Sequence, residues 1–538
     1  MLAFRLLRAP LAMFLVMAPW TASCGASAAS DAVWTISQRS RSEKVPGSGE
    51  YTITETPVDW DPRQTAVIVC DMWDRHWCQG ATDRVAEMAP RMNEALKAAR
   101  RLGMLVIHCP SDTMKFYADM PQRKLAQQAL RVPVQSMPAG WCPLGAHKEP
   151  PLPFDNSHDR CDCTPQCPHG NPWRRQIATL EIADNDAITD SEEAYFLMRE
   201  RGIKNVVVMG VHTNMCVLGR PFSIRRMAAL GQNVVLVRDL TDCMHDALSA
   251  PEGLDHFRAT DLVVEHIEKH WCPTITSHDL LEGTAFVFRE DQRPHAVFVI
   301  GEDEYETWNT LPVFAEKELA PRGLRVTIVQ ANPRDKNDFP GLEALPSADA
   351  LLVSVRRRTP QQQQLDLIRR FVAAGKPVVG IRTASHAFSL RDDKPASAGH
   401  DTWPEFDAQV LGGHYTGHHE NNDDGTPRTE IWSLPEARSN PILAGFPDQE
   451  VRVISSLYKT SPLAASATPL VMGRGAGGKL DEPVAWTNKT AFGGKVFYVA
   501  LGGPTDFEVP AFRNLLTKGI FWALGKPVPE TPVAARQP

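Results

Sequence analysis

The sequence predicts an α/β protein of two doubly wound, three-layer αβα domains, each with a mainly parallel sheet. At 538 residues the chain is too long for one hydrophobic core. Apolar runs such as "TAVIVC" and "NVVVMGV" show no alternation with polar residues, which is typical of strands covered on both faces. Amphipathic segments of helical length separate these runs, and this order predicts parallel sheets. All 11 cysteines lie at or before position 272, which indicates that two different modules are joined.

The N-terminus has the pattern of a secretory signal peptide over residues 1–30. Arg5 and Arg8 precede the apolar run Leu11–Trp20, and small residues follow it. The run is too short to span a membrane, and no later segment is long and apolar enough to do so. We therefore expect an exported protein, periplasmic or secreted, with lipid anchoring at Cys24 in "TASC" as an alternative. Residues 31–60 are polar and predict an irregular N-terminal arm.

The first predicted domain covers residues 61–282. The expected strands are residues 65–74, 104–110, 204–211 and 233–242, and the expected helices are residues 84–103, 192–203 and 220–231. The first strand ends in acidic residues. A Pro- and Cys-rich insertion, residues 133–175, interrupts the alternation of strands and helices.

A linker over residues 283–292 precedes the second predicted domain, residues 293–526. Its expected strands are residues 295–301, 324–330, 348–355 and 376–382, and its expected helices are residues 316–323, 361–375 and 510–525. The Pro-rich tail, residues 527–538, predicts disorder.

Two residues with reactive side chains stand where strands of the first domain end. Asp71 follows the first strand, and Cys216 follows the strand 204–211 at the start of a helix. Sites in open α/β sheets lie at the carboxyl ends of strands, and a helix start stabilises negative charge on sulfur. These positions indicate a nucleophilic thiol. A buried, inert thiol is the alternative.

The order of these elements resembles the isochorismatase-like cysteine hydrolases, which include nicotinamidases. The matching features are Asp71 after the first strand, "GVHTNMCV" at 210–217, and "RDLTD" at 238–242. The resemblance covers residues 60–280 and implies that Cys216 attacks an amide or similar carbon with Asp71 as the base. It implies an oxyanion site made by backbone N–H groups of the Thr213–Cys216 turn and a cis Val211–His212 bond. The turn residues implied in this way are Val211, His212, Thr213 and Met215.

The family's catalytic triad also contains a lysine, which this chain lacks. Residues 149–203 contain no lysine, and Ile182 stands at the position expected for it. Arg174, Arg175 and Glu181 are the polar residues nearest to that position in the sequence. An arginine cannot relay a proton near neutral pH, although its charge can lower the pKa of a thiol.

Two groups of side chains could hold zinc or another divalent metal, although the predicted reaction requires no cofactor. The resemblance to nicotinamidases implies the first group, which consists of Asp74, His76 and His108. The segment "CDCTPQCPHG" offers a dense set of thiol and imidazole ligands of the kind that suits zinc, namely Cys161, Cys163, Cys167 and His169. In an exported protein, disulfides of this segment with Cys142 or Cys78 are expected ahead of zinc, and free thiols last.

The second domain has its candidate site at "KPVVGIRTASHAF" (376–388), a strand followed by a sharp turn and a helix. Arg382 stands where class I glutamine amidotransferases carry their nucleophilic cysteine. With "DEPVAWT" and "GGKVFYVALGG", residues 293–526 resemble the trehalose-utilisation (ThuA-like) family, which is linked to sugar metabolism. Gly503 stands where that family is expected to have a histidine. The residues that match its implied polar pocket are Arg382, His386, His414, Glu482 and Trp486.

The sequence therefore predicts an exported cysteine hydrolase that acts on a C–N or related bond of a small molecule, with an accessory sugar-related domain. Two alternatives remain open. The chain could bind small molecules or carbohydrates through two degenerate enzyme folds, or catalysis could reside in the second domain. The net charge of −7 and the lack of a basic stripe predict no nucleic-acid partner. The first resemblance implies a small-molecule substrate and, as an alternative to a monomer, a homo-oligomer.

Overall fold

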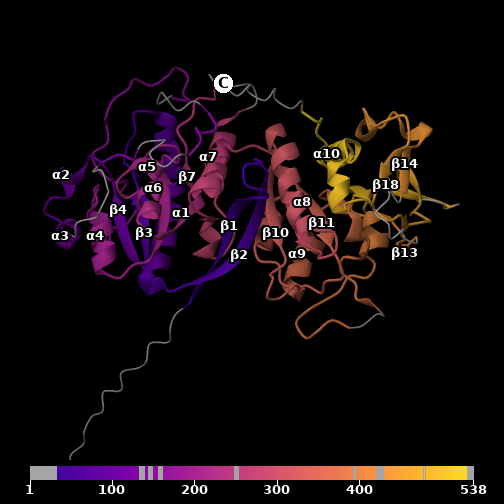
Figure 1. Cartoon of the computed structure of the whole chain (residues 1–538), viewed down its shortest axis with the longest axis horizontal. Coiled ribbons are helices and arrows are strands. Elements are labelled where there is room, and N and C mark those ends of the chain that lie inside the picture. The colour runs from indigo at the N-terminus through magenta and orange to yellow at the C-terminus, as the bar shows by residue number, and fades with distance from the viewer. Residues whose placement is uncertain are drawn as a thin grey trace, which may run out of the picture.

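The computed structural model describes residues 33–131, 140–142, 149–154, 161–247, 254–391, 395–419, 429–475, 478 and 480–529. Within these residues the chain forms two α/β domains that lie side by side (Figure 1). The predicted signal peptide, including Cys24, and most of the predicted tail lie outside the described residues. None of the helices described is long and apolar enough to cross a membrane.

The first domain is built on an eight-stranded sheet with the order β2-β1-β8-β7-β6-β3-β4-β5. The strands are β1 (Trp34–Glu43), β2 (Tyr51–Trp60), β3 (Thr65–Cys70), β4 (Leu105–Cys109), β5 (Ala187–Ile188), β6 (Asn205–Val211), β7 (Asn233–Asp242) and β8 (Thr274–Ile275). Strands β3 to β8 pair in parallel, as the sequence predicts. Their carboxyl ends therefore meet at one edge of the sheet.

Helices cover both faces of this sheet because successive side chains of a strand point to opposite sides. In β3, Ala66 and Ile68 belong to a core with the helices α4 to α7, whereas Val67 and Val69 belong to a second core with α1. The helices are α1 (Gln79–Arg101), α2 (Met114–Tyr117), α3 (Pro121–Gln128), α4 (Glu193–Glu200), α5 (Cys216–Gly219), α6 (Ile224–Ala229) and α7 (His256–His270). The predicted three-layer arrangement is confirmed.

The N-terminal segment is not an irregular arm, so that prediction is wrong. Residues 34–60 form the hairpin β1–β2, whose pairs run from Trp34 with Trp60 to Glu43 with Tyr51. The hairpin extends the sheet because Arg39 pairs with Thr274 of β8. Its many polar side chains are explained by its position, since it lies at the boundary with the second domain (Figure 1).

The second domain has a nine-stranded sheet with the order β10-β9-β11-β12-β19-β18-β17-β14-β15. Neighbours in the first part of this order, β10-β9-β11-β12-β19, pair in parallel. Neighbours in the remaining part, β19-β18-β17-β14-β15, pair antiparallel. Strands β13 and β16 form a separate pair. The bounds are β9 (His295–Gly301), β10 (Arg325–Gln330), β11 (Ala350–Val355), β12 (Val378–Ile381), β13 (Gly417–His418), β14 (Thr429–Ser433), β15 (Val451–Val453), β16 (Tyr458–Lys459), β17 (Thr468–Gly475), β18 (Asp481–Lys489) and β19 (Lys495–Val499).

This sheet also lies between two helical layers. Val297 and Val299 of β9 face a core with α9, whereas Phe298 and Ile300 face a core with α8 and α10. The helices are α8 (Thr307–Phe314), α9 (Gln362–Ala373) and α10 (Pro510–Ala523). As in the first domain, the carboxyl ends of the parallel strands come together at one edge, where sites in such sheets are found.

Candidate functional site

Asp71 and Cys216 come from neighbouring strands of the first domain. Asp71 directly follows β3, and Cys216 opens α5 after β6. The two strands are parallel partners, with Cys70 opposite Gly210. Gly210 has a φ of +113°, and a Cβ there would lie 2.0 Å from the carbonyl oxygen of Cys70. Glycine therefore permits the close approach of the strands at the site.

The Asp71 carboxylate is fully buried and has three partners. One oxygen accepts the backbone N–H of Ser111 at 2.7 Å. The other lies 3.3 Å from Nε of Arg220. The Cys216 thiol is close enough to this carboxylate for each side chain to shift the pKa of the other. The structure thus brings the two predicted residues together at the strand ends.

Arg220 is the cation of this site, and the sequence analysis missed it. Its side chain interacts with both Asp71 and Cys216, and it also pairs with Asp112 at 3.2 Å. The guanidinium lies 5.9 Å from the ring centroid of Trp141. The family pattern directs attention to residues upstream of the cysteine, whereas Arg220 comes four positions after it. The signal that could have found it is its place at the end of the short helix that Cys216 opens.

The resting charge of the pair follows from burial. Burial raises the pKa of the Cys216 thiol well above its ordinary value, and the Asp71 carboxylate beside it acts in the same direction. Burial also raises the pKa of Asp71, although Arg220 opposes this effect. Burial and Asp71 therefore raise the pKa of the Cys216 thiol by more than the charge of Arg220 lowers it. Cys216 rests as a neutral thiol and depends on Asp71 to take its proton.

The predicted oxyanion turn has the expected backbone form, and part of its donor set is already used. The Val211–His212 bond is cis, as predicted. The N–H of Thr213 donates to the carbonyl of Asp242 at 2.9 Å, and that of Met215 donates to the carbonyl of His212 at 3.0 Å. These two N–H groups hold the turn in place, which corrects their predicted role as oxyanion donors in this conformation.

The polar residues considered in place of the lysine lie in other contacts. Arg174 and Arg175 donate their backbone N–H groups to Asp74, and the Arg175 side chain lies 3.9 Å from Asp74. Glu181 pairs with Lys97 at 3.0 Å. Of Arg174, Arg175, Glu181 and Arg220, only Arg220 interacts with the proposed nucleophile and its base in the described part of the chain.

The predicted metal group of Asp74, His76 and His108 does not form. Both ring nitrogens of His108 are used, one by Gln176 at 2.9 Å and one by Asp186 at 3.0 Å. His76 accepts the N–H of Cys78 and packs against aromatic rings, and burial lowers its pKa to about 4. These residues do not fit a metal, because the imidazoles serve the packing of the fold.

The cysteine-rich insertion is arranged differently from its sequence pattern. The residues whose ligand atoms converge are Cys78, Cys161, Asp162 and Cys163, all within 4.8 Å of one another. His169 instead stacks on Trp77 at 4.0 Å. No disulfide joins any of the ten cysteines of the described residues, so the expected disulfides are not formed there.

In the second domain, Arg382 follows β12 and is almost completely buried. Its guanidinium lies 4.1 Å and 4.5 Å from the ring centroids of Tyr305 and Tyr458. It donates to the carbonyl of Ala500 at 2.8 Å and to Oγ of Ser456 at 3.0 Å. The charge is thus taken out of water and balanced by aromatic faces and oxygens.

His386 lies on the same edge and stacks on Tyr415 at 4.4 Å. Burial, reinforced by Arg357, lowers the pKa of His386 to about 3, so its ring is neutral at physiological pH. Together with Arg382 it forms a basic and aromatic group at the carboxyl ends of the parallel strands.

Three other predicted residues of this domain play different parts. Trp486 is fully buried, and its N–H donates to the carbonyl of Leu411, so it belongs to the core. Glu482 accepts the N–H groups of Thr460 and Ser461, both at 3.0 Å, and thereby holds a loop. His414 is exposed. These findings remove Trp486 and Glu482 from the predicted pocket.

Backbone strain gathers at the same strand ends. Within the described residues, those other than glycine with positive φ are Asp71, Asp112, Glu306, Arg357 and Arg382. They follow β3, β4, β9, β11 and β12 respectively. Such conformations cost roughly 1–3 kcal/mol each and cluster at active sites and ligand clamps. Both domains therefore carry strained backbone at the edge where sites are expected.

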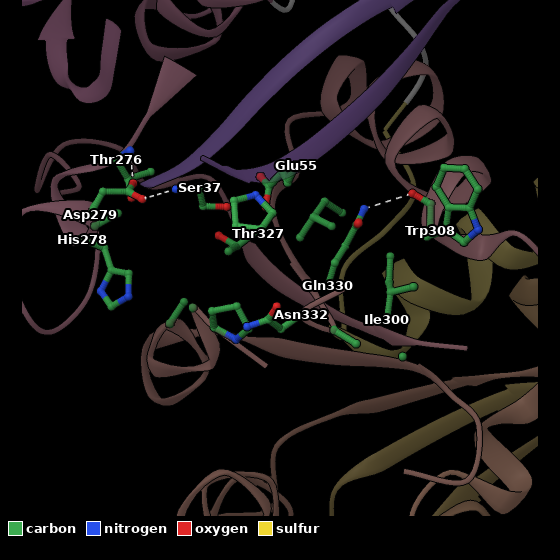
Figure 2. Close-up of a pocket in the computed structure, with 18 of the residues that line it drawn as sticks. Ser37, Glu55, Thr276, His278, Asp279, Ile300, Trp308, Thr327, Gln330 and Asn332 are labelled. Carbon is green, nitrogen blue, oxygen red and sulfur yellow. Dashed lines mark hydrogen bonds between the residues drawn. The ribbon is translucent and has the colours of Figure 1, made fainter. Parts of the chain in front are cut away.

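A cavity of about 560 Å³ lies elsewhere, between the two domains. Figure 2 shows its walls: Ser37 and Glu55 from the hairpin, Asp279 from the end of the first domain, and Thr327 and Gln330 from β10. Asp279 accepts the N–H groups of Ser37 and Thr276. None of the predicted catalytic residues lines it.

Comparison with known protein families finds a match within the second domain. Residues 297–523 match the family model described as trehalose utilisation, ThuA. A comparison with curated proteins finds no match. A putative ThuA-like protein from Parabacteroides merdae ATCC 43184 is 15% identical, with 45% of this chain and 94% of that chain covered and a TM-score of 0.33.

Two further solved structures match the other part of the chain. A cysteine hydrolase from Pseudomonas syringae pv. phaseolicola 1448A is 17% identical, with 41% of this chain and 92% of that chain covered and a TM-score of 0.27. An isochorismatase family protein from Burkholderia thailandensis is 16% identical, with 40% and 93% covered and a TM-score of 0.24. The chain is thus a fusion of two α/β domains, the second of which matches the trehalose utilisation family model over residues 297–523.

Proposed function

We propose that the first domain is a hydrolase that cleaves a C–N or related bond of a small molecule, with Cys216 as the nucleophile. The observation that supports this function is the mutual contact of Cys216, Asp71 and Arg220 at the carboxyl ends of β3 and β6. A nucleophile and a base within hydrogen-bond reach, with a third group orienting the base, is the arrangement that covalent catalysis requires.

The reaction that this geometry supports begins with a proton transfer. Asp71 takes the thiol proton as the sulfur of Cys216 bonds to the substrate carbon, and then gives that proton to the leaving amine. A water molecule, deprotonated by Asp71, next attacks the thioester and releases the acid and the free thiol. Arg220 keeps its positive charge throughout and stabilises the carboxylate, so it acts as a positioning residue.

The test is ammonia release from a panel of small primary amides and N-carbamoyl compounds. Cys216→Ala is expected to abolish turnover of any substrate found, because the thioester cannot form. Cys272→Ala is the matched control, since Cys272 is also a buried free thiol but lies beside β8. Full activity of the Cys216→Ala protein would rule out the proposal.

A second candidate function is supported by the group around Arg382 and His386. Its buried guanidinium, stacked tyrosines and strained backbone suit the binding or conversion of a sugar-derived molecule. Oxidised sugars therefore belong in the same panel, with a His386→Ala variant. Turnover that survives Cys216→Ala and is lost in His386→Ala would place catalysis in the second domain. Saturable binding without any turnover would instead favour two degenerate enzyme folds.

Export and assembly are further parts of the proposal. The charged and apolar pattern of residues 1–30 supports export, with removal of these residues or lipid attachment at Cys24. Cell fractionation with intact-mass measurement tests this, and a cytoplasmic, full-length product would contradict it. Sedimentation of the purified chain distinguishes a monomer from a homo-oligomer.

A further inference from the structure

Four thiols from two distant segments meet at the start of α1, away from Asp71 and Cys216. We name them the thiolate cluster, which consists of Cys78, Cys161, Cys163 and Cys167. Sγ of Cys78 lies 3.3 Å from that of Cys161 and 3.8 Å from that of Cys163. Cys167 lies beside them, since its backbone N–H donates to Sγ of Cys161 at 3.5 Å. Cys78 comes directly before α1, and the other three belong to the insertion.

The spacing of these sulfurs is that of ligands around one centre. Zn–S bonds of about 2.3 Å in a tetrahedron place neighbouring sulfurs about 3.8 Å apart. A disulfide requires about 2.05 Å and joins sulfurs in pairs. Cys78 is close to both Cys161 and Cys163, and a carboxylate oxygen of Asp162 lies within 4.8 Å of all three sulfurs. This convergence on a common centre favours a cation over paired bonds.

Backbone N–H groups point at the sulfurs, which is an independent observation. Gln79 and Gly80, the first residues of α1, donate to Cys167 at 3.4 Å and to Cys163 at 3.2 Å. Two further N–H groups donate to Sγ of Cys161, from Cys163 at 3.4 Å and from Cys167 at 3.5 Å. Such donors, together with the positive end of the helix, stabilise a thiolate more than a thiol.

The acidic and thiol groups around the thiolate cluster also favour a bound cation. Cys78 and Cys161 are buried, and a carboxylate oxygen of Asp162 lies within 4.8 Å of both sulfurs. Thiolates this close to one another and to a carboxylate repel unless a cation lies between them. Arg84 pairs with Asp162 at 2.7 Å but also serves Asp242 at 2.8 Å, so its charge is shared between two carboxylates. A divalent ion bound by the sulfurs supplies the missing charge.

We propose that the thiolate cluster binds one zinc ion as a structural site. The ligands are Cys78, Cys161 and Cys163 with a carboxylate oxygen of Asp162 as the fourth, since these are the atoms that converge. Binding releases the three thiol protons. The ion ties the insertion to the start of α1. This matters for the first domain because the same insertion continues to Trp173, which stacks on Trp73 at 4.6 Å and on His76 at 5.7 Å. His76 in turn contacts His212 in the turn before Cys216.

The test uses the full chain, purified from cells grown with zinc, and measures metal content by mass spectrometry. We expect about one zinc per chain, retained in the control Cys272→Ala and lost in Cys163→Ser and Cys78→Ser. Cobalt exchanged into the unaltered protein is expected to show the thiolate charge-transfer and visible bands of a tetrahedral sulfur site. This second measurement needs no variant and is therefore independent of how the variants fold.

Each other outcome overturns the proposal. A chain without zinc whose four cysteines are joined as disulfides, or are all free to react with an alkylating reagent, has no metal site here. Zinc that persists in both cysteine variants is bound elsewhere. Because metal content and cobalt spectra are read without any substrate, failure of this proposal is distinguishable from failure of the hydrolase proposal.

Discussion

Arg220 contacts both Asp71 and Cys216, and it differs from a lysine in one decisive property. A guanidinium stays protonated at physiological pH, so it contributes charge and geometry but no proton. Asp71 must therefore handle every proton in the proposed reaction. Arg220 thus supplies the local positive charge and leaves the proton transfers to Asp71.

Replacement of Arg220 tests this division of roles. An opposite charge within hydrogen-bonding distance lowers a carboxyl pKa by about one to three pH units, so Arg220→Met should raise the pKa of Asp71 further by that amount. The pH profile of kcat/KM should then shift its acidic limb upward. Arg220→Lys keeps the charge and should leave the limb nearly in place. Equal pH profiles in all three proteins would contradict the role assigned to Arg220.

The unaltered protein has its own expected pH dependence. Burial raises the pKa of Asp71 above its ordinary value, and the reaction requires the carboxylate form. Activity should therefore fall as the pH drops through this raised pKa, at a higher pH than an exposed aspartate would give. Steady-state rates across the acidic range measure this limb. An acidic limb in the ordinary aspartate range would show that Asp71 is not the base.

At the scale of elements, the approach of β3 and β6 determines whether the site forms. Gly210→Ala places a Cβ against the Cys70 carbonyl and demands a φ that alanine rarely adopts. We expect a loss of about 1–3 kcal/mol in the free energy of unfolding and a larger loss of activity, because the strand ends separate. Chemical denaturation and the amide assay measure the two effects. Gly231→Ala, at a positive φ with no atoms nearby, is the control for backbone strain alone.

A buried ion pair holds α1 to the end of β7. Arg84 bonds to Asp242 at 2.8 Å, and together with His256 it keeps the pKa of Asp242 well below its usual range although burial opposes this. Arg84→Met should cost about 3 kcal/mol, because it removes the guanidinium from the buried carboxylate of Asp242 and leaves only His256 beside it. Lys97→Met removes an exposed pair on the same helix and should cost less than about 1 kcal/mol. Similar losses in the two variants, measured by denaturant unfolding, would contradict this account.

At the scale of the molecule, the hairpin β1–β2 connects the domains. Arg41 of β1 pairs with Glu268 of α7 at 2.7 Å and with Glu316 of the second domain, and its side chain is 5% exposed. Arg41→Met removes the guanidinium that joins the two acids, which leaves Glu268 with Arg39 and Glu316 with Lys269, and should cost about 3 kcal/mol, the low end for a broken buried pair. Calorimetry should then show two separate melting transitions in place of a coupled one.

The control for this prediction is another ion pair across the same boundary. Arg334 and Asp59 lie 3.4 Å apart, with both side chains exposed, so Arg334→Met should cost no more than about 1 kcal/mol and leave the transitions coupled. If Arg41→Met melts like the unaltered protein, the hairpin does not couple the domains.

The predictable part of the fold rests on local patterns. Buried strands such as β3 and β6 are recognisable because every residue in them is apolar or small, and their order with helices predicts parallel pairing. Asp71 and Cys216 could be identified because they directly follow such strands. The hairpin was missed because polar side chains along β1 and β2 are explained only by the second domain, which covers them.

Among the candidate site residues, too, local patterns do not show which distant segments a side chain contacts. Trp486 stands on a strand among polar neighbours, but the fold places its ring in the core, with its N–H on Leu411. His108 carries a typical ligand side chain, but Gln176 and Asp186 use both of its nitrogens. No local pattern reveals these partners, because they come from segments far away in the sequence.

The sequence by itself determined that this protein has two α/β domains and that Asp71 and Cys216 lie at strand ends, because these features depend on residues close together in the chain. Only the tertiary structure decided that Arg220 is the cation beside them and that Cys78 joins the cysteines of the insertion. Both results depend on which distant segments meet at the carboxyl edge of the sheet. That is settled by packing and charge pairing in three dimensions, where short contacts join residues separated by tens of positions.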